Sequence, residues 1–367
     1  MPQTDLFAPL DFAHGAPMKN RFMLAPLTNQ QSHADGTLSD EEFHWLTMRA
    51  KGGFGLTMTC AAHVQKIGQG FPGQLGIFSD AHLPGLTRLA KAIKADQSLA
   101  VVQLHHAGNR SPRDLIGEAP VCPSDDPETG ARALSEAEVA QLIEDFIAGA
   151  VRAKAAGFDG VEIHGAHGYI LCQFLSPALN RRTDAYGGSA ENRARIVLEI
   201  LEGIRARCGE DFLIGLRLSP ERFGLELMEI RDLAARMLQH PALDFLDMSL
   251  WDVRKEPTEE AHKGRSLMSY FTDLPRSHVR LGVAGKIMTA AQARDTLAEG
   301  ADYVLIGRAA ILHHDYPQKV AADPGFEPIA LPVSRAHLAA EGLSPTFIDY
   351  MNNWPGFVAQ EQKEDAL

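Results

Sequence analysis

Short apolar runs alternate with longer amphipathic segments along most of this chain of 367 residues. Such an order is typical of parallel β-strands joined by helical crossovers. The pattern predicts eight strands, at residues 21–26, 55–61, 99–104, 158–164, 212–218, 243–249, 279–284 and 302–307. Eight strand–helix units close most naturally into a (β/α)8 barrel of the TIM type, although a doubly wound open sheet uses similar units.

Helix start signals stand between several of the predicted strands. A capping box pairs a hydroxyl residue with a Glu or Gln three positions later, and each side chain then satisfies a free backbone N–H of the first turn. The sequence has this spacing at Ser39 with Glu42, Ser135 with Glu138, and Thr289 with Gln292. After Ser135, apolar residues from Val139 to Val151 recur at helical spacing, and Gly157 is predicted to end that helix.

Three segments do not fit the repeat, namely residues 1–20, 111–133 and 323–367. We interpret them as an N-terminal extension, a lid loop after the third strand and a C-terminal tail, rather than as further domains. The whole chain, residues 1–367, is therefore predicted to be a single domain with its barrel core at about residues 19–322.

Composition narrows the classes of partner and the compartment. The formal net charge of −12 argues against nucleic acid and against anionic membranes, since both would repel this chain. No stretch approaches the roughly 20 apolar residues of a membrane span, and the amino terminus lacks the pattern of a signal peptide. The four cysteines show no CxxC spacing, which predicts free thiols and neither zinc nor an iron–sulfur cluster. We expect a cytoplasmic enzyme that acts on a small molecule.

Candidate chemistry is expected where the strands end, because the carboxyl ends of barrel strands form the active-site mouth. The residues at those ends are Pro26, Leu27, Thr28, Ala61, Gln103, His164, Arg217, Gly285, Lys286, Gly307 and Arg308. The last two strands end in a glycine followed by a cation. Loops at these places often bind phosphate in barrels, although the glycines could also simply turn the chain beside solvated cations.

His164 and His167 stand three residues apart and are followed by Tyr169. A helical turn after the strand would put both imidazoles on one side. Three readings are open: a metal site, which lacks the glutamate of an HExxH pattern; a buried structural pair; or two hydrogen-bond donors that hold a carbonyl or anionic oxygen, with the phenol as proton donor. The last reading is favoured, and no metal is expected.

A long run after the fourth strand resembles the signature of the Old Yellow Enzyme family of FMN-dependent ene-reductases: VEIHGAHGYILCQFLSPALNRRTDAYGGSAENR. The flanking runs NRFMLAPLT, VVQLHHAGNR and VLIGRAA resemble the same family in order and spacing. The resemblance implies non-covalent FMN, NAD(P)H as reductant, and ping-pong hydride transfer to the activated C=C bond of an α,β-unsaturated carbonyl compound.

The resemblance also assigns roles to residues of this chain. Ala25, Pro26, Leu27 and Thr28 would line the flavin ring, with Thr28 at O4; Ala61 would pack beside the ring, Gln103 would meet the pyrimidine edge, and Gly285, Lys286, Gly307 and Arg308 would hold the phosphate. Arg217 would lie near flavin N1 and O2, where a permanent cation stabilises the charge of the reduced flavin. His164, beside the flavin, and His167 would bind the substrate's carbonyl oxygen, and Tyr169 would protonate the α-carbon.

Several points stay open at this stage. Thr28 and Gln30 stand where a subset of the family has cysteine and tyrosine, and HHAGNR departs from the commoner HAGR spacing, which leaves the role of Arg110 open. The tail aromatics Tyr350, Trp354 and Phe357 could cover a pocket, contact a neighbouring subunit in a homo-oligomer, or pack on their own barrel. A non-redox lyase or isomerase acting on a phosphorylated substrate, and a flavoprotein without turnover, remain as alternatives.

Overall fold

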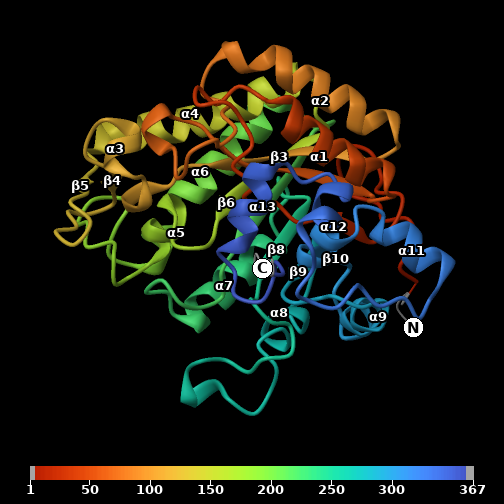
Figure 1. Cartoon of the computed structure of the whole chain (residues 1–367). Helices are drawn as coiled ribbons and strands as arrows, with labels where there is room; N and C mark the ends of the chain where they lie inside the picture. Colours follow the sequence, from red (N-terminus) through yellow and green to blue (C-terminus); the bar gives the residue numbers. More distant parts are fainter. Residues whose placement is uncertain (1–4, 361–367) are drawn as a thin grey trace.

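Residues 5–360 are described by a computed structural model, and they form a closed parallel barrel (Figure 1). The barrel order is β1-β10-β9-β8-β7-β6-β3-β2. The strands are β1 (Phe22–Leu24), β2 (Leu56–His63), β3 (Leu99–His105), β6 (Gly160–Gly165), β7 (Leu213–Leu218), β8 (Phe245–Ser249), β9 (Arg280–Ala284) and β10 (Tyr303–Ile306). All eight predicted strands are thus confirmed, and closure of the sheet excludes the doubly wound alternative.

Helices surround the barrel and connect its strands (Figure 1). The main ones are α1 (Asp40–Lys51), α2 (Leu83–Ala95), α4 (Glu136–Ala155), α6 (Ala190–Cys208), α7 (Leu227–Met237) and α9 (Ala290–Ala298). Shorter elements are α3 (Arg113–Ile116), α5 (Ile170–Leu175), α8 (Ser269–Thr272), α10 (Arg308–Leu312), α11 (Tyr316–Ala322), α12 (Arg335–Ala340), α13 (Pro345–Asn352), four 3-10 turns (Lys66–Gly68, Asp80–His82, Gly108–Arg110, Glu260–His262), and the small sheet of β4 (Val121–Cys122) and β5 (Arg132–Ala133) within the predicted lid.

Capping follows the prediction at two of three helices. The capping boxes at residues 135–138 and 289–292 are present. At α1, Ser39 accepts from the backbone N–H of Glu42, but the predicted return bond from the Glu42 side chain is wrong. That carboxyl is buried instead and accepts from Asn29 Nδ2 at 3.1 Å. Burial raises the pKa of Glu42. This side chain therefore packs in the interior and does not cap the helix.

Apolar side chains fill the barrel, and glycines make room for the largest of them. A Cβ at Gly282 would lie 2.1 Å from the Tyr303 ring, and one at Gly215 would lie 2.0 Å from the Phe245 ring. Each aromatic ring therefore occupies the space that a neighbouring strand leaves free. The N-terminal extension supplies Phe12, whose ring is 6.0 Å from that of Phe245. The predicted extension thus packs against one end of the barrel.

The tail packs on its own barrel. Phe347 of α13 is buried, with its ring 5.4 Å from that of Trp45 in α1. Figure 1 shows α12 and α13, in blue, lying across the barrel. The described part of the tail, up to residue 360, therefore follows the own-barrel alternative, while its division from a core at about residue 322 stays a proposal.

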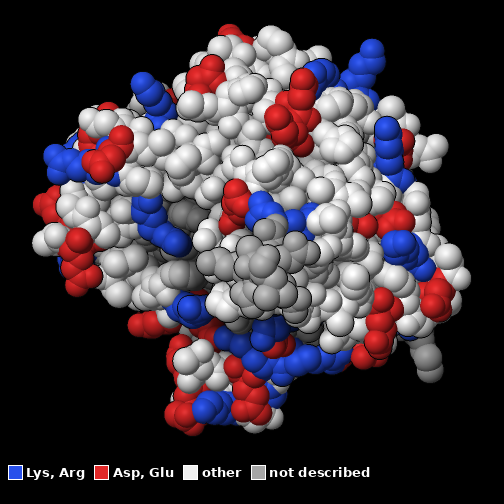
Figure 2. All heavy atoms as spheres, in the orientation of Figure 1, with Lys and Arg blue, Asp and Glu red and all other residues white. Residues whose placement is uncertain are grey.

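Surface charge, helix hydropathy and the state of the cysteines can be compared with the expectations from composition. Over much of the face in Figure 2 basic and acidic side chains are interspersed, with a group of basic ones in the lower half. Among the described residues, no helix combines the length and apolarity that crossing a membrane requires. All four cysteines are buried free thiols, as expected. The cytoplasmic location stays a prediction.

Candidate active site

A cavity of about 400 Å³ lies at the carboxyl ends of the barrel strands. Strands of a parallel barrel all deliver their last residues to this end, so side chains that are distant in sequence meet there. Ten of the predicted site residues line the cavity: Ala25, Pro26, Leu27, Thr28, His167, Arg217, Gly285, Lys286, Gly307 and Arg308. Most of the residues predicted from the strand ends therefore do lie around one cavity.

The remaining four predicted residues lie beside this cavity rather than in its lining. Ala61 and Gln103 are paired across β2 and β3. His164 is the register partner of Arg217, which does line the cavity. The ring of Tyr169 lies 5.3 Å from that of His164. All four therefore belong to the same end of the barrel.

Two imidazoles meet at the end of β6. The chain leaves this strand through His167 at φ 62° and Gly168 at φ 72°, both left-handed. The rings of His164 and His167 stand edge to face with centroids 5.0 Å apart, and His164 Nε2 is 3.3 Å from His167 Nδ1. The predicted pairing is therefore present, but the predicted helical turn is wrong: a left-handed turn brings the rings together.

Neighbouring loops hold this turn in place. The backbone N–H of His167 donates to Ser219 Oγ at 2.9 Å, and its carbonyl oxygen accepts from Arg110 Nη1 at 2.6 Å. The same guanidinium lies over the Tyr169 ring, 4.8 Å from its centroid. Arg110, whose role the sequence left open, thus fixes the backbone of one site residue and contacts the ring of another.

The imidazoles of the mouth are neutral at physiological pH. Burial lowers the pKa of His167 to about 3, and the nearby charges of Arg217 and Arg110 act in the same direction. Burial and the adjacent imidazoles place the pKa of His164 well below its usual range. A neutral imidazole carries one N–H donor and one lone pair. These rings can therefore donate hydrogen bonds to an oxygen without carrying charge.

Tyr169 stands at the amino end of α5, against a further buried imidazole. Its ring is 4.3 Å from that of His105, and the two planes are nearly perpendicular at 82°. Burial also lowers the pKa of His105 well below its usual value. Neither ring nitrogen of His105 has a partner within the described residues. The Tyr169 ring therefore lies between two neutral imidazoles, with the Arg110 guanidinium over its face.

A buried carboxyl pair lies beneath Arg217, on the strands that flank it. Gln103 Nε2 donates to Glu162 Oε1 at 2.6 Å, and the Tyr303 hydroxyl donates to Asp247. Burial and the adjacent Asp247 raise the pKa of Glu162 well above its usual value. Arg217 Nε has no partner in the part of the chain that the structure describes. A buried guanidinium N–H of this kind calls for an acceptor.

Cations and glycines gather at the other end of the cavity. Lys286 Nζ pairs with Asp252 at 3.1 Å. The exposed Arg308 makes no hydrogen bond or ion pair to residues 5–360. A Cβ at Gly285 would lie 2.8 Å from the backbone nitrogen of Asp252, so only glycine fits there. Arg308 is thus a free cation, Lys286 is partly neutralised by Asp252, and the backbone approaches closely at Gly285. Together they form a site for an anion.

Comparison with known proteins now decides the family. Residues 5–324 match the model of the NADH:flavin oxidoreductase / NADH oxidase family. The chain is 38% identical over 326 residues to the probable NADH-dependent flavin oxidoreductase YqiG of Bacillus subtilis, covering 86% of this chain and 87% of the relative. It is 34% identical over 316 residues to an NADPH dehydrogenase of Halalkalibacterium halodurans, covering 85% and 92%.

A solved structure agrees with the sequence relatives. The Old Yellow Enzyme homologue of Zymomonas mobilis superposes with a TM-score of 0.78 at 28% identity, covering 91% of this chain and 96% of that one. This chain belongs to the Old Yellow Enzyme family. It is an FMN-dependent NAD(P)H oxidoreductase, which confirms the resemblance and leaves the lyase or isomerase alternative without support. Some relatives are longer, and the chain spans 36% of one and 48% of another.

The residues of this family member fit an FMN group. The unpartnered Arg217 Nε offers a donor to an electron-rich ring edge, and the free Arg308 offers a charge to a phosphate. Gln103 has its amide N–H₂ held by Glu162, which leaves its carbonyl oxygen for a ring N–H. Polar groups at one end and cations at the other match the two ends of this cofactor.

Sequence reasoning missed several residues that line the cavity of this flavoenzyme. Ser249 ends β8 and would have emerged if the strand-end rule had been applied to the sixth strand. Trp251, 56% exposed at φ 65°, follows it. The tail aromatics Tyr350, Trp354 and Phe357 were not missed, because covering a pocket was one of their sequence alternatives, and all three line the cavity.

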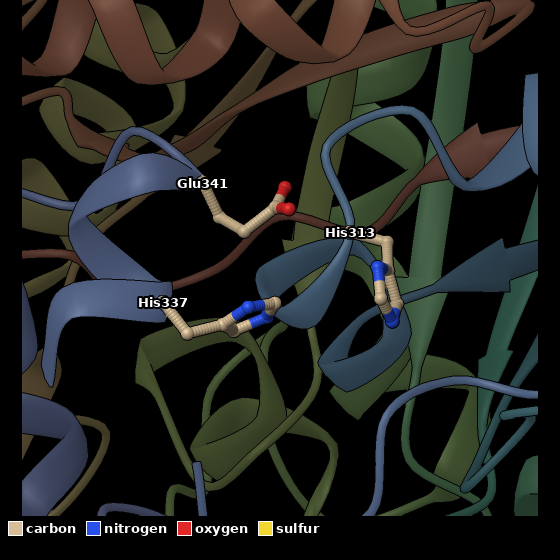
Figure 3. A group of neighbouring side chains, drawn as sticks. All are labelled: His313, His337 and Glu341. Carbon is tan, nitrogen blue, oxygen red and sulfur yellow. The ribbon is translucent and has the colours of Figure 1, made fainter. Parts of the chain in front are cut away.

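A second group of histidines lies beneath the tail of this enzyme, where His313, His337 and Glu341 face one another (Figure 3). Their spacing would suit a metal ion, but the hydrogen bond of His313 does not. His313 Nε2 accepts from the backbone N–H of Ile329 at 3.0 Å, so a neutral ring keeps its proton on Nδ1, the atom that faces the group. His337 Nε2 is paired with the Leu312 carbonyl oxygen at 2.9 Å. These contacts join the tail to the barrel.

Proposed function

We propose that this enzyme reduces the activated C=C bond of α,β-unsaturated carbonyl compounds. The observation that carries the proposal is the pair of neutral imidazoles, with His164 Nε2 and His167 Nδ1 only 3.3 Å apart beside the cavity. Two N–H donors that converge in this way suit a single oxygen atom on which negative charge develops. A carbonyl conjugated to an alkene offers such an oxygen.

Each group then has a role that this chain can perform. Bound FMN, reduced by NAD(P)H, supplies the hydride that reaches the β-carbon of the alkene. Arg217 neutralises negative charge at the buried ring edge, and Arg308 with Lys286 holds the phosphate. His164 and His167 hold the carbonyl oxygen and stabilise the enolate charge that forms on it. The aromatic side chains of the tail keep water from the mouth.

Tyr169 would complete the reaction by donating its phenolic proton to the α-carbon. Its ring lies within 5.3 Å of His164, so a substrate oxygen held by the histidines would bring the α-carbon near the hydroxyl. The overall change is one hydride and one proton added across the double bond. Protonation by a positioned acid typically contributes about 10²–10⁴-fold to the rate.

The variant Tyr169→Phe tests this assignment in the FMN-loaded enzyme. We expect stopped-flow reduction of the flavin by NAD(P)H to be unchanged, whereas its reoxidation by 2-cyclohexenone should slow by about 10²-fold or more. Tyr186→Phe, which removes a phenol that donates to Glu199 and does not line the cavity, serves as the matched control. Equal loss in both half-reactions would contradict the role of Tyr169, and a reduced wild-type flavin that no enone reoxidises would contradict the proposed function.

A further inference from the structure

A chain of contacts links the two imidazoles of the mouth to a hydroxyl. The backbone N–H of Ala166 lies 3.3 Å from His164 Nδ1. His164 Nε2 lies 3.3 Å from His167 Nδ1, and His167 Nε2 lies 2.7 Å from Ser249 Oγ. Every ring nitrogen of the pair therefore has one neighbour, and the nature of each neighbour determines where the protons are.

Without substrate, this chain has one consistent arrangement of protons. A backbone N–H can only donate, so His164 Nδ1 carries the lone pair and Nε2 carries the proton. His164 then donates to His167 Nδ1. A neutral His167 must consequently carry its proton on Nε2 and donate it to Ser249 Oγ.

A bound carbonyl oxygen requires a different arrangement. Both rings must then donate to the oxygen, so His167 needs its proton on Nδ1. Its Nε2, half-buried beside the cavity, then carries a lone pair that needs a donor, because an acceptor left unsatisfied as the site fills is costly. Ser249 Oγ is the neighbour at this nitrogen in the described structure, and a hydroxyl can turn from acceptor to donor.

Arg217 favours this second state of the hydroxyl. Its Nη2 lies 3.5 Å from Ser249 Oγ and can only donate. The guanidinium thus interacts with a lone pair of the oxygen and leaves the hydroxyl hydrogen free to point at His167. Ser249 also sits at the carboxyl end of β8, on a rigid strand, so its position does not depend on a mobile loop.

We propose that Ser249 is a positioning residue that selects the tautomer of His167: it accepts from Nε2 in the free enzyme and donates to Nε2 when a carbonyl oxygen is bound. The proton of His167 thereby moves from Nε2 to Nδ1 on binding, and no charge is gained or lost. This inference rests on the proposed function, because it takes the two histidines as the pair that binds the oxygen.

The tautomer is measured directly by NMR of the FMN-loaded protein labelled with ¹⁵N-histidine. Spectra are recorded with oxidised flavin, with and without 2-cyclohexenone, so that the enone binds but does not turn over. His167→Gln assigns the His167 signals. In the wild type and in Ser249→Thr, which keeps the hydroxyl, the His167 proton should move from Nε2 to Nδ1 when the enone binds.

Two variants without the hydroxyl test the need for it. Ser249→Val has the shape of the threonine variant, and Ser249→Ala removes the group with least crowding; FMN content and the melting temperature establish that each is folded. In both, the proton should stay on Nε2, and the Kd for 2-cyclohexenone should rise about tenfold relative to Ser249→Thr. A proton that moves to Nδ1 as in the wild type, or an unchanged Kd, would overturn the proposal.

The outcome also separates this inference from the proposed function. If the enone binds the wild type and binds His164→Ala much more weakly, but Ser249→Val equals Ser249→Thr, then the role of Ser249 alone is wrong. If the enone binds wild type and His164→Ala equally, the histidines do not hold the carbonyl and both proposals are overturned.

Discussion

Two groups of histidines in this enzyme look alike in composition and differ in what their nitrogens contact. In the mouth, His164 and His167 direct nitrogens at one another beside a cavity, and a hydroxyl completes the chain. Under the tail, His313 and His337 have one nitrogen each bound by backbone groups, and burial lowers the pKa of His313. The first group can exchange its internal contact for a ligand, whereas the second is engaged in holding two segments together.

This difference distinguishes a ligand-binding site from a group of residues that only holds two segments together. Proximity of histidines and carboxylates is common to both groups. What separates them is the partner of the second ring. His164 Nδ1 also accepts from a backbone N–H, but His167 contacts a hydroxyl, which can donate or accept. His313 and His337 are each held by a backbone group that can do only one of the two. Variants with equivalent substitutions in the two groups test whether the groups differ in this way.

The largest effect is expected from removing one donor of the mouth. His164→Ala should lower kcat/KM for 2-cyclohexenone by about 10²–10³-fold, the usual cost of losing one donor to a developing oxyanion. His337→Ala, the matched change in the tail group, should leave kcat/KM unchanged. Steady-state kinetics at equal FMN content measure both, and similar losses in the two variants would erase the distinction.

Acid should weaken the fold through the mouth histidines. An unfolded histidine binds its proton below pH 6.5, whereas His167 does so only below about 3 when folded. Between these values the unfolded state binds more protons, so stability falls as the pH falls. Each such histidine lowers the free energy of unfolding by up to about 1.4 kcal/mol per pH unit. Burial likewise lowers the pKa of His63 to about 4 and of His106 to about 3.

Denaturant unfolding between pH 7 and pH 5 checks this slope. His106→Gln, which removes a titrating group that lies outside the cavity lining, should make the dependence on pH shallower. A slope equal to that of the wild type would mean that this imidazole is protonated in the folded enzyme.

The smallest effect concerns the tail clamp. Burial alone would raise the pKa of Glu341, but hydrogen bonds from the His314 side chain and backbone lower it to about 2. This carboxylate therefore stabilises the fold above its ordinary pKa of 4.5, and the contribution is lost as the pH falls towards 2. Glu341→Gln should cost about 1–2 kcal/mol at pH 7, with kcat nearly unchanged. Calorimetry at pH 7 and pH 3 should find a smaller difference between the variant and the wild type at the lower pH.

Much of the barrel was predictable because strands and helices follow from short-range patterns. The strand positions agree to within two residues at each end: β1 is shorter than predicted, at Phe22–Leu24 instead of residues 21–26, and β2 continues to His63 beyond the predicted end at residue 61. Strand ends are set by pairing with neighbouring strands, which local apolar patterns do not show. The predicted hydrogen bond from the Ser39 backbone N–H to the Glu42 carboxylate is absent, because that carboxyl is buried and accepts from Asn29 in the interior.

The candidate site was predictable in part. The rule that residues at strand ends converge accounts for eight of the ten predicted residues that line the cavity, all but Ala25 and His167, and the same rule would have found Ser249. The left-handed turn at His167 was not predictable from spacing, because a non-glycine residue with positive φ is uncommon and is held by contacts to Ser219 and Arg110 from other loops.

The sequence by itself determined the order of strands and helices, the closed barrel they favour and the residue types at its mouth, since these depend on periodicity and on neighbours along the chain. Only the tertiary structure decided which of these residues are neutral, which nitrogens face each other and what lies across the mouth. Burial and hydrogen-bond partners depend on residues far apart in the chain, such as His167 and Ser249 or Thr28 and Tyr350. The protonation states and hydrogen-bond partners of the site residues are therefore set by the folded barrel.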